Sequence, residues 1–277
     1  MDNKRTVVGI DAFTQSVKAI AWSDDGRPVA EGRAALTLQQ SAPGYIEQDA
    51  DEWWAATGTA LRALTAATEA DAIAGIAISN QRETVALLDA AGQPIGPAIT
   101  WLDSRVSDSF RDLADSFGGE RLHAISGRPV DTIPVVYRLH WLRRHRPELI
   151  DRAHSIVDVH GFLSQQLTGT AHASHISADA FGIFDIVERC WSCPLLDHLG
   201  IPLHKLPAAA ATGLRAGTAV FAGGGDGQCA GLGVGRDAAR DRVPQSRNRD
   251  RRRDMVVRAC PEPKMAHDPI AYRRIFP

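Results

Sequence analysis

Apolar and polar residues alternate through the first 36 positions of the chain. A short apolar run, "RTVVGIDA" at residues 5–12, ends in an acid. The segment that follows, residues 16–36, keeps a period of two on both sides of "DDG" at 24–26, and this tripeptide is a turn signal. The pattern predicts three consecutive antiparallel strands.

The period then changes from two to that of a helix. Residues 49–70 read as a helix, with Asp49 or Asp51 available as the N-cap. Two apolar segments, 73–79 and 83–89, read as strands.

Further along, helical and extended patterns alternate. Residues 103–117 and 134–150 predict amphipathic helices, the second with an apolar face at Val136, Leu139 and Leu142. Residues 155–169 predict a strand and then a helix that Gly169 closes. A last strand runs into a glycine-rich loop within 219–235. This order predicts an α/β fold with a mixed sheet, in one domain over residues 1–235.

Charge separates that domain from the rest of the chain. Residues 1–235 carry 19 basic and 27 acidic side chains, whereas residues 236–277 carry 12 and 6. Six arginines fall within 242–253, but the tail interleaves few aromatic residues with them, which disfavours nucleic acid as a partner. We expect residues 236–277 to be a disordered basic tail.

The composition also bears on the compartment. The chain has no apolar run of 18 residues and no apolar signal core at its N-terminus, so we expect neither membrane insertion nor export. Its four cysteines suit free thiols in a reducing compartment. These features predict a cytoplasmic protein and leave the oligomeric state open, a homodimer included.

The first strand pair carries residues suited to phosphate and metal chemistry. Asp11 ends a strand, and Thr14, Ser16 and Lys18 follow on the hairpin. Hydroxyls and backbone N–H groups in such a turn can bind phosphate oxygens, and a carboxylate can hold Mg²⁺ through water. An ordinary polar hairpin is the alternative.

Two further segments suit a polyol. In "NQRE", Arg82 donates and Glu83 accepts, so the pair can hold neighbouring hydroxyls, although a surface ion pair is the alternative. In "WLDSR", Asp103 is a possible contributor to the same site, or simply a helix N-cap.

The glycine-rich loop holds the strongest catalytic candidate. Asp226 follows three glycines after a predicted strand and precedes a segment of small residues. A carboxylate in that position can take a proton from a substrate hydroxyl.

Five segments, in this order and spacing, resemble the FGGY family of carbohydrate kinases across about residues 6–235. They are "GIDAFTQSVKA" (9–19), "GYIEQDADEWW" (44–54), "WLDSR" (101–105), "LTGTAHASHISADAFGIFD" (167–185) and "GGGDGQCAGLGVG" (223–235). The resemblance implies a ribonuclease H-like, actin-like fold. It also implies transfer of a phosphoryl group from ATP–Mg²⁺ to a hydroxyl of a sugar or polyol.

The resemblance also implies roles for individual residues. Asp226 would be the general base, and Asp11, Thr14, Ser16 and Lys18 would face Mg²⁺ and the ATP phosphates, with Asp11 on the metal side. Arg82 and Glu83 would bind polyol hydroxyls as in glycerol kinases, together with Asp103 and Gln228. Phe13 stands where the family usually has glycine.

The family carries a second domain that holds the adenosine, and the match stops at Gly235. Three alternatives follow: a polyol kinase in truncated and poorly active form, a ketose kinase of the xylulokinase type, and a non-catalytic remnant that binds a sugar or nothing. We interpret the tail as frameshift-derived. Read one base later, residues 243–255 admit a strand and the Gly-Thr turn that the family has next.

Overall fold

The computed structural model describes residues 6–210 and 219–221. The predicted domain boundary at residue 235 and the basic tail at 236–277 lie outside these ranges.

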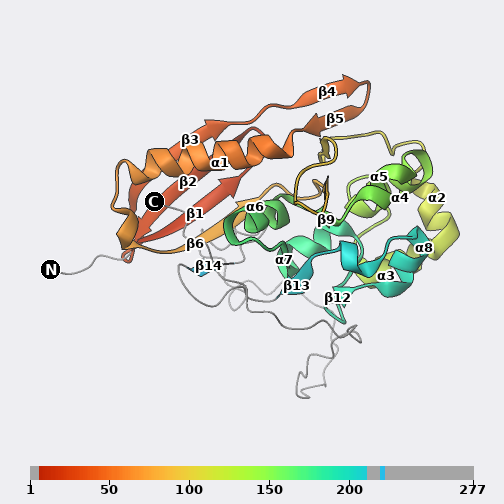
Figure 1. Cartoon of the computed structure of the whole chain (residues 1–277). Coiled ribbons are helices and arrows are strands. Elements are labelled where there is room, and N and C mark those ends of the chain that lie inside the picture. Colours follow the sequence, from red (N-terminus) through yellow and green to blue (C-terminus); the bar gives the residue numbers. More distant parts are fainter. Residues whose placement is uncertain (1–5, 211–218, 222–277) are drawn as a thin grey trace, which may run out of the picture.

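A five-stranded mixed sheet forms the N-terminal layer (Figure 1). Strands β1 (Thr6–Ala12), β2 (Ser16–Ser23) and β3 (Pro28–Ala35) make an antiparallel meander. Strands β6 (Ile73–Asn80) and β14 (Ala219–Phe221) run parallel to β1, which gives the order β14-β6-β1-β2-β3. The predicted three-stranded opening and the mixed sheet are both confirmed.

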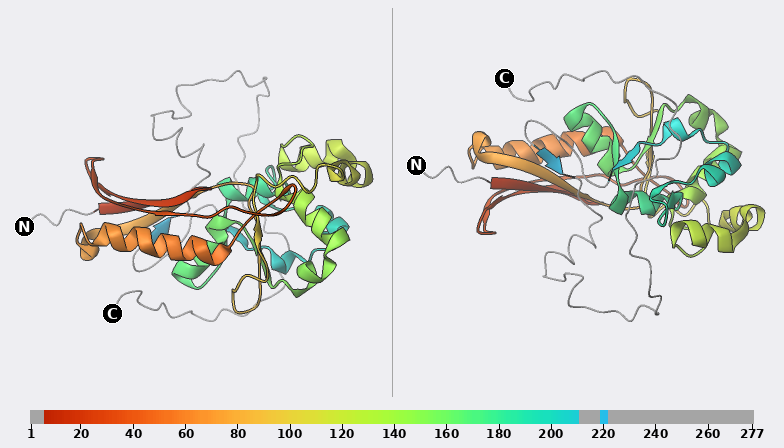
Figure 2. Two further views of the ribbon diagram at one scale, coloured as in Figure 1. Left: turned by 90° about the horizontal axis from the view of Figure 1, so that it is seen from above. Right: turned by 90° about the horizontal axis from the view of Figure 1, so that it is seen from below.

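Helix α1 (Ala50–Thr65) covers one face of this sheet by packing on β2 and β3. Asp49 is its N-cap and accepts a hydrogen bond from the Asp51 backbone N–H, which decides between the two candidate caps. Helix α6 (Val159–Thr168) lies on the same side, as Figure 2 shows, and ends at Gly169 in the left-handed conformation as predicted.

Smaller sheets and helices form the other half of the described structure. The remaining strands are β4 (Gln39–Ala42), β5 (Tyr45–Gln48), β7 (Ala86–Leu88), β8 (Ala98–Ile99), β9 (Ser155–Val157), β10 (His172–Ser174), β11 (Phe184–Asp185), β12 (Cys190–Trp191) and β13 (Ala208–Ala210). The remaining helices are η1 (Ala70–Ala72), α2 (Phe110–Leu113), η2 (Ala114–Gly118), α3 (Gly119–Ser126), α4 (Val135–His145), α5 (Pro147–Arg152), α7 (His175–Ala178), η3 (Asp179–Phe181), α8 (Cys193–Leu199) and η4 (Leu203–Lys205). None of the helices in the described ranges combines the length and apolar character that a bilayer span requires.

Two predicted helices are interrupted. The helix expected over 103–117 begins only at Phe110, because Asp103 bonds to its own loop, and it passes through the π-helical turn η2 into α3. The helix expected over 134–150 breaks at Arg146, since the residue before a proline is disfavoured in helical geometry. Its predicted apolar face at Val136, Leu139 and Leu142 is buried.

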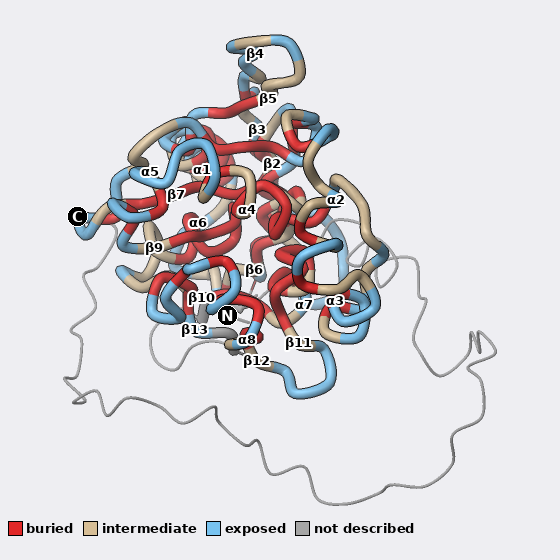
Figure 3. The backbone as a smooth tube through the Cα atoms, turned by 90° about the vertical axis from the view of Figure 1, so that its right-hand side faces the viewer, coloured by how far each residue is buried: buried red, intermediate tan, exposed pale blue. Residues whose placement is uncertain are grey.

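The buried residues form two hydrophobic clusters. Figure 3 shows buried segments at the centre of the molecule and exposed segments on the outer turns. One cluster fills the space between the five-stranded sheet, α1 and α6, and the other lies among α2, α3, α4, α5 and α8. Side chains from β7 alternate between the two: Leu87 belongs to the helical cluster, and Ala86 and Leu88 belong to the sheet cluster. This alternation follows from the period of two in a strand, so β7 contributes side chains to both cores and lies between them.

Candidate functional site

The predicted phosphate residues gather at one end of the sheet. Asp11 on β1 is paired in register with Lys18 on β2, so their side chains share a face. Their neighbours Ile10 and Val17 are buried on the α1 side. The face opposite α1 therefore carries the side chains of Asp11, Lys18 and Ser16. The predicted phosphate-binding role requires the three side chains to share a face in this way.

Each hairpin side chain already has a contact within the protein. Lys18 Nζ lies 3.1 Å from Glu31, and the Ser16 hydroxyl accepts hydrogen bonds from Arg33. The side chain of Phe13, at the turn, is exposed (43%). A phosphate bound at this hairpin would approach the backbone most closely at the turn, and the bulky Phe13 side chain occupies that place.

Thr14 is buried and connects the hairpin to "WLDSR". Its hydroxyl oxygen accepts a hydrogen bond from the Trp101 indole N–H at 3.0 Å. Because that contact uses a lone pair, the hydroxyl proton is free to point elsewhere. Trp101, to which the sequence analysis assigned no role, is 41% exposed and thus presents much of its ring to solvent.

Gln48 lies at the centre of a buried network. Its amide nitrogen donates to the Thr14 carbonyl at 2.7 Å, and its amide oxygen accepts from Gln81 Nε2 at 2.7 Å and from Trp53 Nε1 at 3.1 Å. The network therefore fixes the hairpin, the start of α1 and the "NQRE" loop relative to one another. Only the fold could show this, because the three segments are far apart in sequence.

Arg82 and Glu83 lie in a cluster of four charged side chains, which we call the charged quartet: Arg82, Glu83, Arg128 and Asp179. Arg82 Nη2 donates to Asp179 at 2.6 Å, and Arg128 Nη2 donates to Glu83 at 2.5 Å. The ring is completed by longer approaches of 3.6 Å between Arg82 and Glu83 and 3.9 Å between Arg128 and Asp179. Arg82 and Glu83 have side chains only 13% exposed, so they are not an ordinary surface ion pair.

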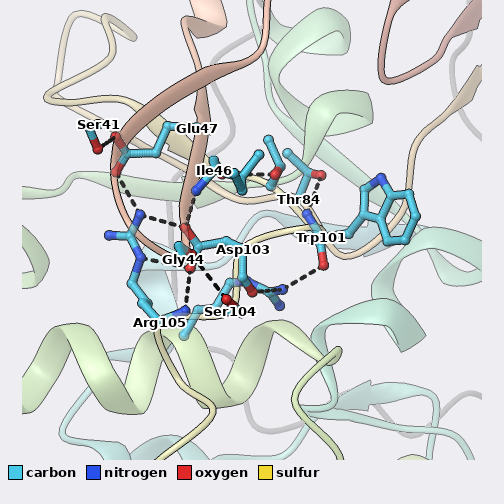
Figure 4. Close-up of polar contacts among 11 residues, drawn as sticks. Ser41, Gly44, Ile46, Glu47, Thr84, Trp101, Asp103, Ser104 and Arg105 are labelled. Atoms are coloured by element: carbon cyan, nitrogen blue, oxygen red, sulfur yellow. Dashed lines mark hydrogen bonds and ion pairs between the residues drawn. The ribbon is translucent and has the colours of Figure 1, made fainter.

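Asp103 lies in a separate, fully packed cluster (Figure 4). One carboxylate oxygen accepts from Arg105 Nε at 2.8 Å, and the other accepts from the Ile46 N–H at 2.7 Å and from Arg105 Nη2 at 2.8 Å. Arg105 also donates to Glu47 at 2.6 Å and stacks over the ring of Tyr45. The Asp103 side chain is 0% exposed, so we leave it out of the polyol site; nor does it cap a helix.

The electrostatics of this cluster favour the charged form of Arg105. Burial alone would lower the pKa of Arg105, but hydrogen bonds to Asp103 and Glu47 outweigh that effect and raise the pKa. Two carboxylates thus keep one buried guanidinium charged.

Arg138 is a buried cation that the sequence analysis missed. It donates to the carbonyls of Ile133, Trp101 and Asp103 at 2.5, 3.0 and 3.2 Å. Burial lowers the pKa of Arg138 to about 10. The Arg138 guanidinium holds the Trp101 loop beside the Ile133 loop. In the sequence, Arg138 looks like one more polar residue on a predicted helix.

Asp226 and Gln228 lie outside the described residues. Strand β14, which precedes them, is parallel to β6 and lies in the same sheet as β1. Their proximity to Asp11 stays a prediction. Among the described residues, no group of three or more His, Cys, Asp or Glu side chains forms a metal site, so Asp11 would need water and phosphate oxygens to complete a Mg²⁺ shell.

Known proteins resemble this chain over most of its length. Residues 6–233 match the N-terminal domain of the FGGY family of carbohydrate kinases. A xylulose kinase of Staphylococcus epidermidis is 32% identical, over 84% of this chain and 49% of the relative. An autoinducer-2 kinase of Salmonella typhimurium is 31% identical, over 84% and 48%.

Solved structures agree on the fold. A xylulose kinase from Rhodospirillum rubrum superposes with a TM-score of 0.78 at 25% identity, over 83% of this chain and 51% of that one. The glycerol kinase of Plasmodium falciparum gives 0.72 at 23% identity, over 83% and 50%. The chain therefore spans about half the length of the relatives it matches.

Proposed function

Because the chain belongs to the FGGY family of carbohydrate kinases, with the actin-like fold of that family, we propose that it serves phosphoryl transfer from ATP to a hydroxyl of a small polyol or sugar. The observation that carries the proposal is the largely buried Arg82–Glu83 pair at the end of β6. A guanidinium donates and a carboxylate accepts, which is what a hydroxyl group needs on its two sides.

The hairpin residues would hold the phosphate side. Thr14 can direct its hydroxyl proton to a phosphate oxygen, since Trp101 already donates to that hydroxyl. Ser16 and Lys18 supply a second hydroxyl and a positive charge on the same face as Asp11. Mg²⁺, held by Asp11 through water, would neutralise charge on the transferred phosphoryl group.

Asp226 is the proposed general base. It would take the proton from the substrate hydroxyl as that oxygen bonds to the γ-phosphorus and ADP leaves, while Gln228 contacts the substrate. The exposed face of Trp101 would pack on the C–H groups of the substrate, since aromatic rings combine apolar contact with a polar edge.

The finer choice between a polyol and a ketose rests on different observations. The "NQRE" loop supports a polyol, as in glycerol kinases, whereas the relatives include several named xylulose kinase. The non-catalytic remnant, the frameshift origin of the tail and a cytoplasmic location stay predictions.

The test of substrate binding is calorimetric titration with glycerol, erythritol and xylulose, followed by ATP–Mg²⁺. We expect Arg82→Ala to remove polyol binding, at a cost of about 2 kcal/mol or more for a charged hydrogen bond. The matched control is Arg27→Ala, whose side chain is exposed and paired with Asp25. Unchanged affinity in the Arg82 variant would rule the site out.

Turnover of the 277-residue chain is a separate prediction. Positioning supplies most of phosphoryl-transfer catalysis, and the family uses a second domain for adenosine, so we expect little ADP release from this chain alone. A coupled assay showing about one turnover per second, abolished by Asp226→Asn, would contradict this prediction.

A further inference from the structure

We propose that Arg128 and Asp179 extend the Arg82–Glu83 pair into a four-residue site that selects polyols or sugars of four or more carbons over glycerol. The inference rests on the proposed function. It adds to that function a substrate class and two specificity-determining residues.

The quartet is assembled from three separate parts of the chain. Arg82 and Glu83 follow β6, Arg128 follows α3, and Asp179 opens η3. Positive and negative groups alternate around the ring, with two contacts of 2.5 and 2.6 Å and two of 3.6 and 3.9 Å. The two longer contacts exceed hydrogen-bond distance, so the groups on those sides are not hydrogen-bonded to each other.

Exposure distinguishes the quartet from the chain's other arginine–carboxylate cluster. Arg105, Asp103 and Glu47 have side chains 5%, 0% and 10% exposed, and both oxygens of Asp103 accept hydrogen bonds. Arg128 and Asp179, by contrast, are 24% and 30% exposed. The first cluster is closed to solvent, whereas the quartet is partly exposed through Arg128 and Asp179.

The quartet also has unused hydrogen-bonding capacity. Within the described part of the chain, the Arg82 and Arg128 side chains each donate one hydrogen bond of good geometry, to Asp179 and Glu83. A guanidinium has five N–H donors, and each carboxylate has two oxygens. The N–H donors and carboxylate oxygens that make no hydrogen bond within the quartet can therefore bind ligand hydroxyls.

The backbone supports a binding role for this loop. Glu83 has φ of 54°, in the left-handed region that side chains with a Cβ rarely adopt. Such a conformation is strained and persists where the surroundings hold it, often at ligand sites. Here it directs the Glu83 carboxylate to Arg128.

Counting hydroxyls leads to the substrate class. Once glycerol presents one hydroxyl for phosphorylation, two remain, and a single arginine–carboxylate pair can satisfy both. The second pair, Arg128 and Asp179, would then contact no ligand hydroxyl, because it keeps only its partners within the quartet. A chain of four or more carbons supplies further hydroxyls.

The experiment is calorimetric titration of the full 277-residue chain with glycerol, erythritol, ribitol and xylulose. Wild type should bind ribitol or xylulose more tightly than glycerol. Asp179→Asn should weaken the longer ligands about tenfold more than it weakens glycerol, as expected for one charged hydrogen bond. Arg128→Gln should give the same pattern, and circular dichroism checks that both variants fold.

Asp151→Asn is the matched control. Asp151 also pairs with an arginine at 2.6 Å, Arg143, but on α5, and we expect no change for any ligand. The inference fails if Asp179→Asn and Arg128→Gln weaken all ligands equally or none, while Arg82→Ala still removes binding. Wild type that binds no polyol or sugar would overturn the inference and the proposed function together.

Discussion

Gln48 shows how one buried side chain can hold distant segments in place. It is 0% exposed, and its single amide group serves the Thr14 carbonyl, the Trp53 indole and the Gln81 amide. The amide both donates and accepts, so an apolar residue of similar size cannot replace it.

We therefore expect Gln48→Leu to lower the free energy of unfolding by about 3 kcal/mol or more, because three buried polar groups lose their partner. Urea denaturation measures the change. Gln40→Leu, at an exposed position of β4, is the control and should have little effect. A Gln48 variant as stable as the control would contradict the structural role.

The sequence predicted some residues of the candidate site and missed their partners in the fold. Arg82 and Glu83 were predicted because they are adjacent and follow an apolar strand. Asp179 pairs with Arg82 from 97 positions away, and no local pattern reports such a distance. Arg138 was missed because its acceptors are backbone carbonyls, two of them 37 and 35 positions away in the chain.

At the scale of elements, the contact between β3 and α1 depends on a glycine. A Cβ atom at Gly32 would lie 1.9 Å from the Ala60 carbonyl oxygen of the helix. No side chain can therefore stand between the strand and the helix at this point. The close approach brings α1 onto the sheet and leaves Asp11 and Lys18 on the other face.

Gly32→Ala should destabilise the protein by about 1–3 kcal/mol, since the helix must move away from the strand. Thermal or urea unfolding measures this. Gly96→Ala is the matched control, because a Cβ atom there meets nothing within 4 Å. Equal stability of the two variants would show that α1 does not approach β3 so closely.

The regular elements were predictable where period and caps agree, as in β1 to β3, α1 and α6. The break before Phe110 was not predictable, because side-chain bonds between Asp103 and Arg105 outweigh the helical pattern. The break at Arg146 follows from Pro147 and could have been predicted from sequence.

At the scale of the whole molecule, two histidines link stability to pH. Burial lowers the pKa of His172, with His160 adding to the effect, and burial and Arg144 lower the pKa of His140. Both imidazoles are neutral in the folded state at a pH where the unfolded chain binds protons. Their contribution is present above the ordinary histidine pKa of about 6.5 and is lost as pH falls through the lower, folded values.

The free energy of unfolding should therefore decrease between pH 7 and pH 5. Urea midpoints at the two values measure the decrease, and the double variant His140→Gln, His172→Gln should reduce it. His204→Gln, which replaces an exposed histidine, is the matched control. A pH dependence unchanged in the double variant would assign the effect to other groups.

The position of β7 between two cores has a consequence for motion. The residues of β7, Ala86 to Leu88, cannot leave their places without exposing both hydrophobic clusters to water. Amide hydrogens on this strand should exchange with solvent only in the rarest openings of the protein, when both cores come apart together. The "NQRE" loop runs directly into that strand. If β7 exchanges as slowly as we expect, one end of the charged quartet is anchored, and its side chains can rearrange around a ligand beside a fixed backbone.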